Sequence, residues 1–245
     1  MVELYFGELA VLDVVMAIST CFVASVVIEA AHRMSKTGAP RWASRKVVHS
    51  VMGTVIGLTI FGYSNLSGPA LAVGLFFVVL MFAWAHSSNL VLELLLSGSR
   101  EGETGQSTFI AAFVGLLSFA VVFILFLSRP EIFIAAILAV SWGDASGEVI
   151  GRTFGGRLVK RRFRDKTLEG SLAVFLFTAL SVIVAMIVHP DVCPFCFIPQ
   201  ILVVAAGVSI TEALCTGWRD NLLVPLVCAC LVWLLIFPSA PLLWL

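Results

Sequence analysis

Two acidic residues stand in an apolar part of this chain, at a spacing that places them on one face of a helix. Asp144 and Glu148 are four residues apart, and Arg152 follows after four more. Because residues at i and i+4 are neighbours on a helix surface, the three side chains form a polar stripe. A charge at bilayer depth is costly and is a functional-site hypothesis by default. Two carboxylates that leave coordination positions to water and phosphate oxygens suit Mg²⁺, so Asp144 and Glu148 are candidate metal ligands. The alternative is an ion pair with Arg152 or Arg157 that only satisfies buried charge.

Glycines accompany this stripe at the same period. They recur every four residues, at Gly143, Gly147, Gly151 and Gly155. A row of small residues lets two membrane helices pack closely. The same row also permits a ligand to approach the backbone. The two interpretations are compatible, and the sequence leaves both open.

The stripe lies in one of many apolar runs. Hydrophobic residues make up 60% of the chain and charged residues 12%, and the mean hydropathy is +1.06. A helix needs roughly 20 apolar residues to cross a hydrocarbon core of ~30 Å. We therefore expect an all-α integral membrane protein, one transmembrane domain over 1–245 with eight helices in a bundle. The predicted spans are 9–31, 47–63, 70–92, 108–127, 131–152, 170–188, 199–218 and 221–237.

The basic residues predict the orientation of these spans. Fourteen of the 15 Lys and Arg residues follow the first, third, fifth or seventh span, and only Arg129 falls on the other side. Cytoplasmic loops carry the excess of Lys and Arg, so the basic loops are predicted to be cytoplasmic and both termini non-cytoplasmic. Four polar clusters then share the cytoplasmic face. They are Asp144 to Arg152, Lys166 to Glu169, Arg45 to His49, and Asp220 with Asn221; Glu212 is expected about two turns before the cytoplasmic end of the seventh span.

Three of these clusters begin helices, and helix N-termini attract phosphate through their unpaired N–H groups and the helix dipole. Together with a basic loop on the same face, they predict a pocket for a polyphosphate. His49 is one of few groups there that titrate near neutrality and is a candidate general base. The alternative for His49 is a hydrogen-bonded residue in a helix interface, and Asp220 and Asn221 have the alternative of capping the last helix.

These blocks resemble the CTP-dependent polyprenol and lipid kinases, which include dolichol kinase, phytol kinase and the CTP-dependent diacylglycerol kinase. The resemblance covers about 41–237, and its Lys-Thr-x-Glu-Gly block is closest to the dolichol kinase version. The blocks that carry it are Gly143-Asp144-Ala145 with Gly151 and Gly155, Lys166-Thr167-x-Glu169-Gly170-Ser171, Arg45-Lys46-x-x-His49 with Gly53, Glu212-Ala213, and Asp220-Asn221 with Pro225.

The resemblance implies transfer of the CTP γ-phosphate to the hydroxyl of a membrane lipid alcohol at the cytoplasmic face. Dolichol or another polyprenol is favoured, with phytol and diacylglycerol as the other candidates. The membrane would be the endoplasmic reticulum in a eukaryote and the plasma membrane in a prokaryote. Asp144, His49 and Lys166 would be catalytic, and Asp144 and Glu148 would hold Mg²⁺ or another divalent cation. The implied nucleotide-binding residues are Arg45, Lys46, Gly143, Gly147, Gly151, Arg152, Gly155, Lys166, Thr167, Glu169, Gly170, Asp220 and Asn221.

Other functions fit the sequence less well. A phosphatidate cytidylyltransferase also uses CTP, but its usual His-Gly-Gly and Asp-Arg signature is absent. A transporter would have polar residues spread through the membrane depth, whereas most polar residues here are expected at one face. A P-loop ATP enzyme lacks its Gly-x4-Gly-Lys motif here, and a nucleic-acid partner is not expected.

Several polar residues outside the blocks have weaker interpretations. The side chains of His86, Asn89 and Glu93 share one helical face and are candidates for a contribution to the site. Glu29 and Asp13 of the first span are expected to be packing partners or interface residues. Cys193-x-x-Cys196, expected on the non-cytoplasmic side, is a candidate disulfide, with a zinc site as the less favoured alternative.

Overall fold

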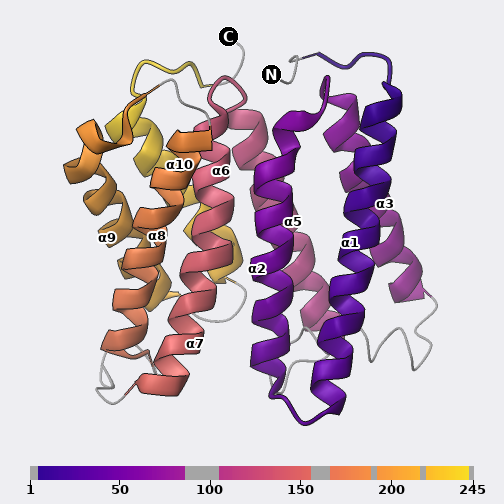
Figure 1. Cartoon of the computed structure of the whole chain (residues 1–245), viewed down its shortest axis with the longest axis horizontal. Coiled ribbons are helices and arrows are strands. Elements are labelled where there is room, and N and C mark those ends of the chain that lie inside the picture. The colour runs from indigo at the N-terminus through magenta and orange to yellow at the C-terminus, as the bar shows by residue number, and fades with distance from the viewer. Residues whose placement is uncertain (1–4, 86–104, 156–165, 189–191, 216–218, 243–245) are drawn as a thin grey trace. The chain divides into compact units, whose positions relative to one another are not determined.

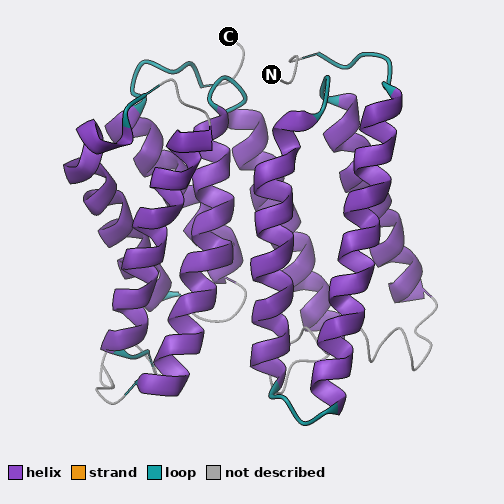
Figure 2. Cartoon of the chain, in the orientation of Figure 1, coloured by secondary structure: helices purple, strands orange, loops and turns teal. Residues whose placement is uncertain are grey.

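The computed structural model describes residues 5–85, 105–155, 166–188, 192–215 and 219–242. All regular structure within these ranges is helical, as Figure 2 shows. The chain forms two compact units, Met1–Ile110 and Ala111–Leu245. The all-α prediction is therefore confirmed for the described residues, whereas the single domain stays a prediction.

The first unit is built on α1 (Val11–Lys36), which packs against α2 (Arg41–Thr59) and α3 (Ser67–Ala85). The short 3₁₀ helix η1 (Ile60–Gly62) follows α2 directly. Gly38 lies between α1 and α2 with φ of 92°, a left-handed conformation that glycine adopts without steric cost.

A buried carboxylate in the first unit joins the start of α1 to the loop between η1 and α3. The side chain of Asp13 is fully buried in the first turn of α1. Its Oδ1 accepts a hydrogen bond of 2.8 Å from the backbone N–H of Ser64, and its Oδ2 accepts from the Ser64 hydroxyl and from the backbone N–H of Ala10. Because buried carboxylates need such donors, Asp13 stabilises the connection between η1 and α3. Its burial agrees with the expected packing role of Asp13, whereas Glu29 is half-exposed and pairs with Arg33 of its own helix.

In the second unit four helical rods contact one another in a ring, and Figure 1 labels their helices. The first rod contacts α8 and α10, and α9 contacts the same two helices, so each rod has two neighbours. Small and branched apolar residues such as Ala136, Val174, Val204 and Cys228 are buried in this unit. The elements are α5 (Gly105–Leu125, which enters the unit at residue 111), the first rod made of α6 (Pro130–Leu138), η2 (Ala139–Asp144) and α7 (Ala145–Phe154), then α8 (Leu168–Val188), η3 (Pro194–Phe197), α9 (Ile198–Leu214) and α10 (Arg219–Ile236).

Each of the eight predicted spans overlaps a helix, but only some of these helices are long and apolar enough to cross a membrane. α2 is not among them, since it begins with Arg41 and also carries Arg45 and Lys46. The apolar helices fit an integral membrane protein, and the count of eight and the orientation stay predictions. The candidates within the described residues are five: Val11–Lys36, Pro130–Phe154, Leu168–Val188, Pro194–Leu214 and Arg219–Ile236.

One predicted boundary is wrong in a way that matters for the site. The seventh span was expected to reach residue 218, but α9 ends at Leu214. Cys215 leaves the helical conformation, and its N–H bonds back to the carbonyls of Thr211 and Glu212. Glu212 therefore lies in the last turn of α9, and not two turns before its end.

Candidate functional site

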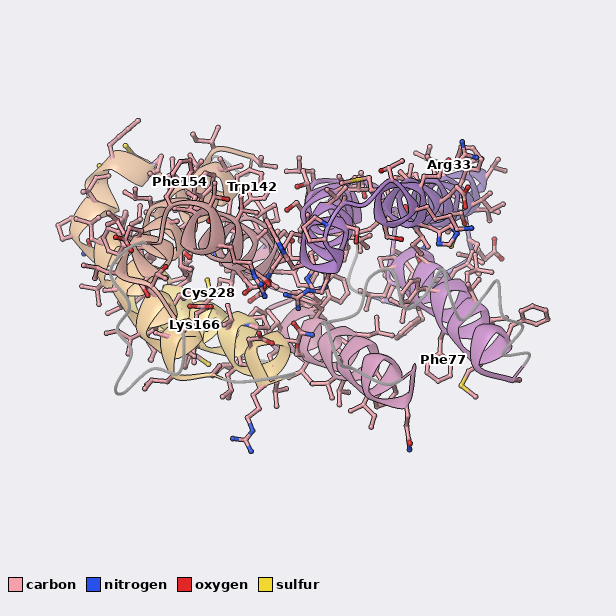
Figure 3. All side chains as sticks on the ribbon, turned by 90° about the horizontal axis from the view of Figure 1, so that it is seen from below. Arg33, Phe77, Trp142, Phe154, Lys166 and Cys228 are labelled. Carbon is pink, nitrogen blue, oxygen red and sulfur yellow. The ribbon has the colours of Figure 1, made fainter. Side chains whose placement is uncertain are left out.

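The rod that carries Asp144 is not a regular α-helix. Between α6 and α7 the chain forms a π-helical segment, Ala139–Asp144, whose last residue is Asp144. Such segments are rare and are frequent at functional sites, because the wider turn redirects the side chains that follow. Trp142 of this segment is marked in Figure 3. The sequence did not predict the π-helix, because the run around it is mostly apolar and gives no periodic signal.

Lys166 contacts a residue at the end of another helix. It lies two residues before α8, and its Nζ forms an ion pair with Oε1 of Glu212 in the last turn of α9. The side chain of Glu212 is 5% exposed and that of Lys166 is 33% exposed. The pair therefore joins two neighbouring rods of the ring at one end of the unit, and Figure 3 labels Lys166 there.

Two further carboxylates act on Lys166. Burial alone lowers the pKa of Lys166, but the carboxylates of Glu212, Asp144 and Asp220 outweigh burial and raise that pKa above its ordinary value of 10.5. Asp144 and Asp220 are both buried. The Cys215 thiol adjoins the same groups, and its pKa is raised by burial and then by Asp220 and Glu212. We call Lys166, Glu212, Asp144 and Asp220 the Lys166 cluster.

The carboxylates of the Lys166 cluster can be compared with the needs of the predicted divalent cation. The four side chains supply three carboxylates, which are hard oxygen donors. The described residues hold no group of three or more His, Cys, Asp or Glu side chains placed to bind a metal by themselves. Mg²⁺ usually needs only one or two carboxylates and takes its other ligands from water and phosphates. Asp144 is the predicted metal ligand within the cluster.

Glu148, the second predicted metal ligand, is engaged by its own helix. Its Oε1 accepts a hydrogen bond of 3.0 Å from Nε of Arg152, and Nη2 of Arg152 lies 3.0 Å from the same oxygen. Arg152 is half-exposed. The structure thus contains the ion pair that was the alternative interpretation for Glu148, and the metal role of Glu148 stays a prediction.

The glycine stripe faces α8. A Cβ at Gly147 would lie 2.4 Å from Cγ2 of Val174, and one at Gly151 would lie 2.8 Å from Oγ1 of Thr167. A Cβ at Gly170 would in turn meet the carbonyl oxygen of Gly147 at 2.7 Å. The small residues therefore let α7 and α8 approach closely, which favours the packing interpretation. The remaining glycines of the stripe, Gly143 and Gly155, face Thr178 and Thr167.

The predicted Lys-Thr-x-Glu-Gly block divides its residues among different tasks. Thr167 precedes α8 and its Oγ1 accepts a hydrogen bond of 3.1 Å from the backbone N–H of Gly170, which is an N-cap. Lys166 belongs to the cluster, and Gly170 packs against α7. Oε2 of Glu169 is buried and has no hydrogen-bond partner among the described residues. Nucleotide binding by these residues stays a prediction.

Asp220 and Asn221 have different contacts and different roles. Asp220 lies in the Lys166 cluster, and its Oδ1 accepts a hydrogen bond of 2.8 Å from the N–H of Asn221. The side-chain amide of Asn221 donates to the carbonyl of Ala111 at 3.4 Å, and the hydroxyl of Ser118 donates to the carbonyl of Asn221. Asn221 therefore fastens α10 to α5, while Asp220 contributes its charge to the candidate site.

The remaining predicted site residues belong to the first unit. Arg45 and Lys46 are buried in the first two turns of α2, and His49 is partly buried. Their spacing of three and four residues places His49 on the same side of the helix as both cations. That they meet the Lys166 cluster stays a prediction.

Comparisons of the chain with protein-family models, curated proteins and solved structures find no match. The resemblance to the CTP-dependent kinases therefore rests on the motifs alone.

The candidates His86, Asn89 and Glu93, and the basic residues of 156–165, lie outside the described residues. Cys193 and Cys196 are both free cysteines, so the disulfide is not formed in this structure.

Proposed function

We propose that this protein transfers the γ-phosphate of CTP to the hydroxyl of a membrane lipid alcohol, with dolichol or another polyprenol as the favoured acceptor. The observation that carries the proposal is the Lys166 cluster. A partly buried lysine pairs with one buried carboxylate and is acted on by two more from other helices, at one end of a ring of apolar helices. The motifs that resemble the CTP-dependent kinases supply the choice of donor and acceptor.

Lys166 would bind the polyphosphate. The raised pKa keeps its ammonium charged at neutral pH, so it can neutralise phosphate oxygens as negative charge develops on them. Phosphate would displace the carboxylate of Glu212 from Lys166. Because Glu212 is buried, that exchange favours a ligand that brings its own cation to the remaining carboxylates.

Asp144 would hold the divalent cation, with Glu148 as a second ligand after release from Arg152. A divalent cation held there would supply charge neutralisation for the transferred phosphate. The lipid hydroxyl would attack the γ-phosphorus, the bond to the CDP oxygen would break, and the hydroxyl proton would pass to water. The parts that the motifs imply for Arg45, Lys46 and His49 of the first unit stay predictions from the sequence.

A transfer assay with purified protein tests this function. The protein is incubated in lipid nanodiscs with Mg²⁺, γ-labelled CTP or γ-labelled ATP, and separate lipid alcohols. We expect label in the lipid from CTP only, with loss of labelling on addition of EDTA. Label from neither nucleotide contradicts the proposal.

A parallel reaction with α-labelled CTP separates kinase chemistry from nucleotidyl transfer. A kinase leaves the α-label in CDP, whereas a cytidylyltransferase moves it into a CDP-lipid when phosphatidate is the acceptor. Thin-layer chromatography resolves the two products. Label in a CDP-lipid would replace the kinase proposal by the cytidylyltransferase alternative.

A further inference from the structure

The second unit carries a pair of cysteines far from the Lys166 cluster. Cys193 immediately precedes η3 and Cys196 lies within it, both exposed and both free. The 21 residues of α8 separate this end of the unit from Lys166, which corresponds to about 30 Å of helix. The pair has no part in the proposed phosphate chemistry.

The local backbone brings the two sulfurs together. The N–H of Cys196 donates a hydrogen bond of 3.2 Å to the carbonyl of Cys193, which closes a tight turn. Side chains at i and i+3 eclipse each other in a 3₁₀ turn. Pro194 occupies the first helical position, where its fixed φ favours this conformation. The turn therefore places the Cys193 and Cys196 side chains on the same side of the backbone.

The two thiols are not equivalent. The Cys196 thiol, and then the backbone N–H groups of Cys196 and Phe195, hold the pKa of Cys193 below its ordinary value. A thiol at the start of a helical turn with a second thiol three residues later is an arrangement in which the first cysteine reacts as the nucleophile. Both cysteines are exposed, and so is Phe195 between them.

We propose that Cys193 and Cys196 form a reversible thiol–disulfide couple, with Cys193 as the attacking thiolate and Cys196 as the resolving thiol. The disulfide closes a loop of only four residues, so it constrains the unfolded chain little and is poorly suited to a purely structural role. Its partner is a small soluble disulfide of the glutathione type.

The exchange balances in two steps. The Cys193 thiolate attacks one sulfur of the small disulfide, whose S–S bond breaks and releases one small thiolate. Cys196 then loses its proton to water and attacks the Cys193 sulfur, which releases the second small thiolate. Two protein thiols are oxidised to one disulfide, and one small disulfide is reduced to two thiols.

Thiol counting on the full chain tests the couple. The protein in nanodiscs is equilibrated with mixtures of reduced and oxidised glutathione, quenched with acid and labelled in SDS with a maleimide polymer. The chain has six cysteines, and we expect two fewer labels at the oxidising limit than at the reducing limit. Peptide mapping by mass spectrometry is expected to find the loss in the peptide that holds Cys193 and Cys196. An unchanged count across all ratios overturns the proposal.

Single variants test the assigned roles. Cys196→Ser is expected to stop at a mixed disulfide with one glutathione on Cys193, whereas Cys193→Ser is expected to take up little. Cys230→Ser, which removes another exposed cysteine, is the matched control and should keep the difference of two labels. Equal glutathione uptake by both single variants, or a two-label loss that persists in Cys193→Ser/Cys196→Ser, overturns the assignment.

Discussion

Two buried carboxylate sites in this protein are satisfied in different ways. Asp13 in the first unit accepts hydrogen bonds from neutral donors of Ser64 and Ala10, all in its own unit. In the second unit, Glu212 pairs with a lysine whose pKa two further carboxylates help to raise. The neutral donors around Asp13 form a structural hydrogen-bond network, here called the fastening, that holds the loop before α3 to the start of α1. Several charged groups gathered around one ammonium make a site whose electrostatics change when an anion and a cation bind.

The largest expected effect separates the two carboxylate sites by activity. Asp144→Asn removes a charge from the Lys166 cluster, and we expect transfer from CTP to fall by about 100-fold or more, as for the loss of a preorganised charge in other active sites. Asp13→Asn disturbs only the fastening, so we expect loss of about 1–3 kcal/mol of unfolding free energy and unchanged activity per folded molecule. Initial rates and unfolding in detergent measure both.

Full activity in Asp144→Asn would remove that residue from the mechanism. A loss of activity in Asp13→Asn that matches the loss in Asp144→Asn would erase the distinction between a fastening and a site.

The second comparison concerns the ion pair itself. Lys166→Met leaves the buried carboxylate of Glu212 without its ammonium. Removing one member of a buried pair costs about 3–5 kcal/mol, and because Lys166 is one-third exposed we expect about 2 kcal/mol. Lys166→Met/Glu212→Gln should recover most of this stability, since no charge is left unmatched. It should not recover activity, because the ammonium that binds phosphate is still missing.

The pH dependence of this pair has a definite sign. The pKa of Lys166 is raised, so its stabilising contribution is complete below the ordinary value of 10.5 and is lost as the pH rises through the raised value. The stability difference between wild type and Lys166→Met should therefore be constant between about pH 6 and 9. If Lys166→Met/Glu212→Gln lost as much unfolding free energy as Lys166→Met and Glu212→Gln lose together as single variants, the two side chains would not interact.

The gathering of distant residues at one end of the second unit was predictable from the sequence. Alternating spans place the end of the Asp144 rod, the start of α8, the end of α9 and the start of α10 on one side. In the structure Lys166 pairs with Glu212, and the charges of Asp144 and Asp220 act on the same ammonium. This part of the prediction needed only the helix ranges and their alternation.

Other features depend on information that periodicity does not contain. The π-helix that ends at Asp144 lies in a mostly apolar run, so its phase shift leaves no periodic pattern. The choice of Glu212 as the partner of Lys166 follows from α8 and α9 being neighbours in the ring, which spacing does not reveal. The link from Asp13 to Ser64 joins residues 51 positions apart through a loop with no sequence signature.

A third comparison asks whether the glycine stripe packs helices or binds ligand. Gly147→Ala places a methyl group 2.4 Å from Val174, and we expect a loss of about 1–3 kcal/mol. Gly147→Ala/Val174→Ala should recover part of that loss. Gly207 in α9 is a matched control, because its Cβ would lie 2.5 Å from Leu231 of α10 and it belongs to no motif.

If packing is the whole role of Gly147, the two glycine variants lose similar stability and both keep the CTP KM of the wild type. A KM for CTP that rises only in Gly147→Ala, and stays high in the compensated double variant, would assign Gly147 to the nucleotide. Thermal unfolding and steady-state rates on the same preparations distinguish these outcomes.

The smallest expected effect tests the fastening at the start of α8. Thr167→Val keeps the shape that packs against Gly151 but removes the oxygen that caps Gly170, and we expect a loss of about 1 kcal/mol. Thr167→Ser keeps the cap and should restore most of this stability. Because Lys166 is the preceding residue, a frayed helix start would also misplace its ammonium, so the Val variant should lose modest activity in parallel with stability. If Thr167→Val kept its stability but lost activity, the Thr167 hydroxyl would be a ligand-binding group. It would then differ from the carboxylate of Asp13, whose hydrogen bonds only hold the first unit together.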